Sequence, residues 1–161
     1  MRSSTTPASH PLPLWALKFL LLLLGVMALV SGSLLIISPD GKLIQFPAHW
    51  LDQTPFRDYL VPGLLLTVFM GILPLVAWWA LWKKPQWSIF TKINPIPSLH
   101  FAWALAFSSA CALMIWILVQ VTMIPYFFLQ PVLFCWGLLI AVLALLPGVR
   151  SYYRVTPRTS T

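Results

Sequence analysis

Residues 15–37 read WALKFLLLLLGVMALVSGSLLII and contain one charged side chain, that of Lys18. A helix needs about 20 predominantly apolar residues to cross the hydrocarbon core of a bilayer, which is roughly 30 Å thick. Lys18 lies near the start of the stretch, where its ammonium can reach the interface while its stem stays among apolar groups. The stretch therefore predicts a membrane-spanning helix.

Three further apolar stretches follow, and the last begins between Pro125 and Pro131. Lipid offers no partner to free backbone groups, and no stretch alternates apolar and polar residues like a barrel strand, so helices are expected. We predict an all-α, polytopic membrane protein in which four transmembrane helices form an up-down bundle. The expected helices cover about residues 15–37, 55–82, 98–121 and 125–147, with Thr54 and Ser98 as N-caps of the second and third. They form a transmembrane domain, 14–147, with an outer loop, 38–54, between cytoplasmic tails, 1–13 and 148–161.

The composition agrees with a membrane protein. Apolar residues make up 60% of the chain and charged residues 8%, whereas a soluble domain carries roughly 25% charged residues. The net charge of +7 could suggest a nucleic-acid partner, but the ten Lys and Arg residues are scattered between apolar blocks and form no stripe. We therefore expect membrane lipids as partners, with a second membrane protein or another copy of this chain as alternatives, and no nucleic acid.

The distribution of charge predicts the orientation. All three acids, Asp40, Asp52 and Asp58, lie in the 38–58 connection, whereas most basic residues lie in the two tails, the start of the first helix and the 83–97 connection. These are Arg2, Lys18, Lys83, Lys84, Lys92, Arg150, Arg154 and Arg158. Because short cytoplasmic loops are enriched in Lys and Arg, both termini are expected in the cytoplasm, with the chain as a multi-pass membrane protein. Alternatively, the first stretch is a signal peptide cleaved near Ser31-Gly32-Ser33, which would leave three spans in the same orientation.

Small residues at four-residue spacing predict where helices approach one another in lipid. Pro62 and Pro74 lie inside the second stretch and are expected to bend it, because each removes a backbone donor. Small residues on two faces of the third helix suggest that this helix is central. The residues with this spacing are Ala28 and Gly32; Gly63, Thr67 and Gly71; Ala102, Ala106 and Ala110; and Ala104, Ser108 and Ala112.

Polar groups collect at the expected outer ends of the helices, and this end is the candidate ligand site. The 38–58 loop above it is rich in apolar residues, which favours a lid or an interfacial segment over a loop in water. The predicted ligand-binding residues are Asp58, Tyr59, Trp116, Gln120 and Gln130. The predicted lid residues are Asp40, His49, Trp50 and Asp52.

No catalytic, cofactor or metal signature is present in the sequence. His49 with Asp52 resembles half of an acid–base or metal pair, but no Ser, Cys or third ligand is placed to complete it. Cys111 and Cys135 lie in apolar runs without a C-x-x-C pattern, so they are expected to be small buried side chains. We therefore predict no catalytic residue, no metal and no cofactor.

Three segments together resemble a family of small four-span bacterial integral membrane proteins. They are Ser38-Pro39-Asp40-Gly41, the run TPFRDYLVPG at 54–63, and Trp116-x-x-x-Gln120 with Leu129-Gln130-Pro131. The resemblance covers about residues 14–147 and implies a fold and a location, but no activity or ligand. The residues that match its pattern are Asp40, Pro55, Asp58, Tyr59, Pro62, Gly63, Trp116, Gln120, Gln130 and Pro131.

Together with the resemblance, these observations favour a non-enzymatic, multi-pass protein of the bacterial inner membrane that binds a lipid or a partner membrane protein at the outer polar cluster. One alternative is a small enzyme or carrier at the outer leaflet, with His49 and Asp52 or Asp58 as acid and base. Another is a structural subunit of a larger membrane complex.

Overall fold

The computed structural model describes residues 12–85 and 98–155, and these residues form an all-helical membrane protein. Three helical stretches are long and apolar enough to span a membrane, namely Leu12–Ile37, Leu60–Lys83 and Phe101–Met123. A shorter apolar helix, Leu129–Leu145, follows them. The elements are α1 (Leu12–Ile37), η1 (Lys42–Ile44), η2 (Ala48–Leu51), α2 (Leu60–Leu65), η3 (Leu66–Ile72), α3 (Leu73–Lys83), α5 (Phe101–Met123), α6 (Leu129–Leu145) and α7 (Pro147–Tyr152).

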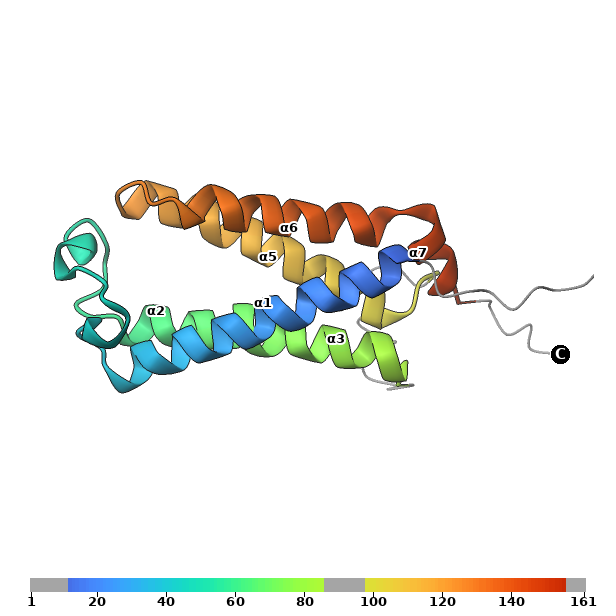
Figure 1. Ribbon diagram of the computed structural model, residues 1–161, viewed down its shortest axis with the longest axis horizontal. Helices are drawn as coiled ribbons and strands as arrows, with labels where there is room; N and C mark the ends of the chain where they lie inside the picture. Colours follow the sequence, from blue (N-terminus) through green and yellow to red (C-terminus); the bar gives the residue numbers. More distant parts are fainter. Residues whose placement is uncertain (1–11, 86–97, 156–161) are drawn as a thin grey trace, which may run out of the picture.

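Consecutive long helices run antiparallel (Figure 1). α1 packs against α2, η3 and α3, while α5 packs against α6. Contacts of α3 with α5 and of α1 with α6 join the two pairs. α1 and α5 thus each contact two of the other spans, so these contacts do not make the third helix more central than the first.

The two ends of the molecule differ in character (Figure 1). One end carries η1, η2 and the turn between α5 and α6, and we call it the loop end. The other carries the start of α1, the end of α3, the start of α5, and α7, and we call it the basic end. The basic residues described at this end are Lys18, Lys83, Lys84, Arg150 and Arg154. Arg2, Lys92 and Arg158, which also supported the predicted orientation, lie outside the described residues.

Two helices begin later than expected because other residues provide the caps. The hydroxyl of Thr54 donates to the Leu51 carbonyl (2.9 Å), which closes a turn, and Asp58 accepts from the Leu60 N–H (3.0 Å) at the start of α2. At the start of α5, Nδ1 of His100 accepts from the Ala102 N–H (3.2 Å), so His100 is the N-cap in place of Ser98. A side-chain acceptor for the first free N–H groups is what an N-terminal helix cap provides.

The second apolar stretch changes its helical winding between its two prolines. Pro62 lies in α2 and Pro74 at the start of α3, while the residues between them, Leu66–Ile72, form a π-helix. Pro74 has no N–H to donate to the preceding turn, and its ring crowds the carbonyl four residues earlier. A wider turn before Pro74 relieves this conflict, and such π segments are common where a helix is interrupted.

The predicted small residues form the crossing between α1 and the α2–η3 stretch. A Cβ atom on Gly32 would collide with the Thr67 hydroxyl and lie 2.9 Å from the Gly63 carbonyl oxygen. A Cβ atom on Gly63 would lie 2.8 Å from Cβ of Leu35. The two backbones can approach this closely because neither glycine has a side chain. This part of the small-residue prediction is confirmed.

The alanine stripe of α5 is confirmed on one face only. Ala102, Ala106 and Ala110 are fully buried, whereas Ser108, in the middle of the second predicted stripe, is exposed. Cys135 is also exposed rather than buried, because it lies on a face of α6 that no other helix covers in the described structure.

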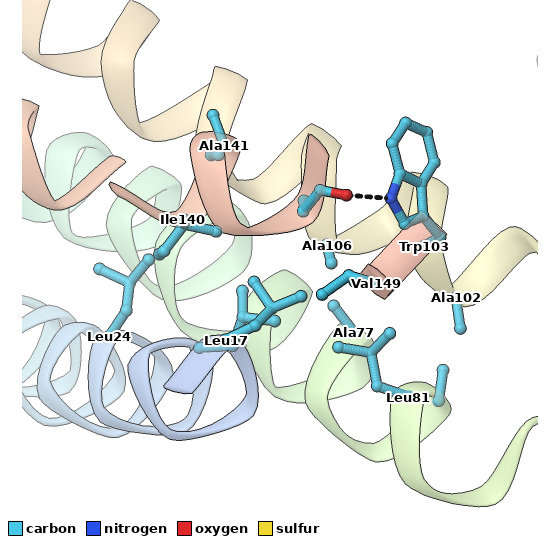
Figure 2. Packing of buried hydrophobic residues seen from close by; sticks show 14 of the residues in the cluster. Leu17, Leu24, Ala77, Leu81, Ala102, Trp103, Ala106, Ile140, Ala141 and Val149 are labelled. Atoms are coloured by element: carbon cyan, nitrogen blue, oxygen red, sulfur yellow. Dashed lines mark hydrogen bonds between the residues drawn. The ribbon is translucent and has the colours of Figure 1, made fainter. Parts of the chain in front are cut away.

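A cluster of buried apolar side chains joins the helices near the basic end (Figure 2). Leu17 and Leu24 of α1, Ala77 and Leu81 of α3, Ala106 of α5, Ile140 of α6 and Val149 of α7 all belong to one buried cluster. Two hydrogen bonds stabilise this cluster. Nε1 of Trp103 donates to the Ala144 carbonyl (2.7 Å), and the hydroxyl of Tyr153 donates to the Leu81 carbonyl (2.6 Å). A buried Trp or Tyr needs such a partner for its polar atom.

We expect Gly32→Ala to destabilise the protein by about 1–3 kcal/mol, because the added methyl group overpacks the crossing. The measurement is thermal unfolding of the purified protein in detergent. Gly148→Ala is the matched control, since no atom lies within 4 Å of the Cβ position at Gly148. Equal melting temperatures for the two variants would contradict the close crossing.

Candidate functional site

The loop end is built on a tight turn around Gly41. Gly41 has a φ of +75° and lies beneath the Tyr59 ring, where a Cβ atom would be 2.8 Å from Cε2 of Tyr59. Its N–H donates to the Ser38 carbonyl (3.0 Å), and its own carbonyl accepts from the Phe46 N–H (3.0 Å). Both the positive φ and the close ring favour glycine at this position.

Asp40 stabilises this turn and does not face a site. Its carboxylate accepts from the Ser38 hydroxyl and the Lys42 N–H, and it forms an ion pair with the Lys42 ammonium (2.8 Å). The hydrogen bond from Lys42, followed by that from Ser38, lowers the pKa of Asp40 to about 2. Asp40, a predicted lid residue, therefore stays ionised at physiological pH and stabilises the turn around Gly41.

Tyr59 attaches the loop to the start of α2. Its hydroxyl donates to the Pro47 carbonyl (2.7 Å), and its N–H donates to the Pro39 carbonyl (2.8 Å). The side chain is 5% exposed, and burial raises the pKa of its phenol. Tyr59 therefore stays neutral and keeps the proton that it donates to the loop.

Four aromatic rings cover the loop end, and we call Phe46, Trp50, Tyr59 and Phe127 the aromatic lid. Phe46 lies 5.4 Å from Trp50 and 5.7 Å from Tyr59, measured between ring centroids. Phe127, from the turn between α5 and α6, lies 5.4 Å from Trp50 and 6.4 Å from Phe46. The lid therefore connects the loop after α1 with the turn before α6.

Gln130 is a buried polar residue behind this turn, in the first helical turn of α6. Its side chain is 1% exposed, and Oε1 accepts from the Phe127 N–H (3.2 Å). The other end of the amide, Nε2, is buried and has no hydrogen-bond partner within the described structure. A buried amide nitrogen with two unused donors costs free energy, so this group is suited to a ligand that brings an acceptor oxygen.

Within residues 12–85 and 98–155, no hydrogen bond or ion pair joins the remaining predicted site residues to Gln130. Asp58 is exposed and caps α2, while Trp116 and Gln120 are partly buried on α5. His49 and Asp52 are both exposed, and the bond between them is from the Asp52 N–H to the His49 carbonyl (3.3 Å). The described chain has no group of three or more His, Cys, Asp or Glu residues placed to hold a metal ion.

Phe46 and Phe127 were not among the predicted site residues, although they complete the lid. A signal for them existed, because the loop and the turn each carry aromatic residues too numerous for water-exposed segments. Their contact joins residues far apart in the chain, and spacing along a single sequence does not reveal such pairs.

An apolar groove lies elsewhere on the surface, along α1 and the π-helix–α3 stretch. It has a volume of about 420 Å³ and is lined by Leu29, Ile72, Leu75, Val76 and Trp79. Its lining can accommodate a hydrocarbon chain but offers little to orient a polar group.

The sequence matches no family model, no curated protein and no solved structure. The resemblance to a family of small four-span membrane proteins therefore stays a prediction.

We expect Tyr59→Phe to loosen the loop, because it removes the hydrogen bond to Pro47, which contributes about 1 kcal/mol. Amide hydrogen exchange of residues 42–54 should become several-fold faster, whereas exchange in α5 should not change. Tyr126→Phe is the control, since Tyr126 is 79% exposed on the neighbouring turn. Unchanged loop exchange in Tyr59→Phe would show that this bond does not hold the lid.

Proposed function

We propose that this chain is a multi-pass protein of a bacterial inner membrane that crosses the bilayer four times and binds a lipid at its loop end. In this proposal both termini are cytoplasmic and the loop end faces outward. Two features support the orientation: five described Lys and Arg residues lie at the basic end, and all three acids lie at the loop end. This is the asymmetry expected when basic segments stay in the cytoplasm.

The fourth crossing is the shortest. α6 has 17 residues, which at 1.5 Å per residue gives about 26 Å, slightly less than the ~30 Å hydrocarbon core. Local bilayer thinning or interfacial residues at the helix ends accommodate such a mismatch. Tyr126 and Phe128, both exposed just before α6, are residues of this interfacial kind.

The observation that carries the lipid proposal is the unpartnered amide nitrogen of Gln130. It lies at the end of a membrane helix, beside an aromatic lid that closes over this end. A headgroup or ester oxygen of a lipid would supply the missing acceptor, while the acyl chains remain among the exposed apolar residues of the helices. The apolar groove on α1 and α3 offers a surface for such chains.

The alternatives have weaker support. An enzyme or carrier that uses His49 with Asp52 or Asp58 needs these side chains to converge, and all three are exposed without a side-chain bond between them in the described chain. Binding of a partner membrane protein, or a role as a structural subunit, would use the exposed apolar helix faces, but no particular face is favoured. We therefore keep lipid binding without catalysis as the proposed function.

The test compares lipid retention by wild type, Gln130→Met and Gln53→Met. Each protein is purified in a mild detergent, and the bound lipid is counted by native mass spectrometry. Removal of one buried hydrogen bond of about 1–3 kcal/mol should weaken lipid binding roughly 5- to 100-fold in Gln130→Met. Gln53→Met is the matched control, because Gln53 is an exposed glutamine of the segment between α1 and α2.

A melting temperature close to that of wild type would show that Gln130→Met is folded. The proposal fails if folded Gln130→Met retains as much lipid as wild type, or if wild type retains none.

A further inference from the structure

The basic end contains a buried cation that has no carboxylate partner within residues 12–85 and 98–155. Lys18 is 5% exposed, and its ammonium lies 4.0 Å from the centroid of the Trp82 ring and 5.6 Å from that of Trp15. The two rings contact each other edge to face, with centroids 5.0 Å apart. Faces of aromatic rings attract a cation, but they do not neutralise its charge.

Lys84 forms a second, similar arrangement at the end of α3. Its ammonium lies 3.6 Å from the centroid of the Tyr152 ring and 4.8 Å from that of Tyr153, and it donates to the Tyr152 carbonyl (3.3 Å). Lys84 has a φ of 45°, in the left-handed region that is unfavourable for a residue with a side chain. The contacts of its side chain with the C-terminal segment help to hold it there.

These two cations act on the same region. Burial lowers the pKa of His100, and the charge of Lys84 lowers it further; the same charge repels that of Lys18. The groups that face this region are therefore cationic, neutral or aromatic. Arg150 adds a guanidinium 5.9 Å from the centroid of the Trp103 ring.

No acidic side chain lies close enough to balance these charges. The three acidic side chains of the sequence are Asp40, Asp52 and Asp58, and all of them belong to the segment between α1 and α2, at the loop end. The two ends are separated by helices of more than 20 residues and by the shorter α6. At 1.5 Å per residue, the acids therefore lie about 25–35 Å from the cations of the basic end. Over that distance an opposite charge is largely screened.

We propose that Lys18 and Lys84 form a binding site for a phosphate-bearing anion, supplied by the headgroup of an anionic phospholipid. The ammonium groups would provide charge-assisted hydrogen bonds to the phosphate oxygens. Trp15 and Trp82 are 48% and 46% exposed, which leaves apolar ring surface beside the site for the glycerol and acyl groups of the same lipid. This favours a lipid over a free phosphate ion. The site lies at the opposite end from Gln130 and does not depend on lipid binding there or on the orientation of the chain.

The experiment measures the affinity of the full chain in detergent micelles for phosphatidylglycerol, phosphatidylcholine and inorganic phosphate, each added alone and followed by native mass spectrometry. We expect phosphatidylglycerol to bind more tightly than phosphatidylcholine, and Lys84→Gln and Lys18→Met each to weaken it about fivefold or more. Lys83→Gln is the matched control, because it removes the same charge from the exposed neighbouring residue, and it should change the affinity less than twofold. Lys84→Arg, which keeps the charge, should bind like wild type and separates loss of charge from misfolding.

Equal weakening by Lys83→Gln and Lys84→Gln would overturn the proposal, because it would indicate diffuse surface charge in place of a site. Equal affinities for phosphatidylglycerol and phosphatidylcholine would overturn it as well. A third outcome is that millimolar inorganic phosphate displaces phosphatidylglycerol from wild type but not from Lys84→Gln. This would support a phosphate site and would assign its ligand to the free ion.

Discussion

Backbone N–H and C=O groups have no water to bond in the hydrocarbon core, so each spanning segment must pair them internally. This constraint makes the apolar stretches helices and makes every helix interruption costly. In the second stretch, a π segment before Pro74 accommodates the interruption. The close approach of Gly32 and Gly63 at the crossing with α1 adds packing there. The charged side chains and the glutamines of the described spans lie near the helix ends. Any specific chemistry of this protein is therefore expected at the loop end or the basic end.

The two ends of the molecule differ in the contacts that hold them together and in the groups left unsatisfied. At the loop end, Tyr59 and Phe46 bring the 38–59 segment down against Phe127, and the unsatisfied group beneath is an amide donor. At the basic end, α7 and Tyr153 lock the helices together through a hydrogen bond to Leu81, and the unsatisfied groups are cations. At both ends the unsatisfied groups named here are hydrogen-bond donors or cations, which need acceptors or anions. A lipid supplies such groups through its ester and phosphate oxygens, which is why both proposals lead to lipid.

The sequence was sufficient to predict the helices, because long apolar runs allow few alternatives, and to predict the glycine crossing, because small residues with regular spacing have few other uses in lipid. The helix starts were harder. Thr54, Asp58 and Ser98 are residue types preferred at N-caps, whereas His100, the N-cap of α5, is not. The choice depends on tertiary contacts such as the His100 N–H bond to the Tyr153 carbonyl (2.8 Å). In the candidate site, Gln130 and Tyr59 were predicted as polar ligand-binding residues. Tyr59 is instead attached to Pro47, twelve residues away, and no pattern in a single sequence reveals that bond.

Orientation in the membrane is the claim on which the functional account depends most directly. In a background with Cys111 and Cys135 replaced by alanine, single cysteines are placed at the exposed positions Gln53 and Lys83, and intact cells are treated with a membrane-impermeant maleimide. The account predicts labelling of Gln53→Cys in intact cells and of Lys83→Cys only after the inner membrane is permeabilised. Labelling of Lys83→Cys in intact cells would contradict it.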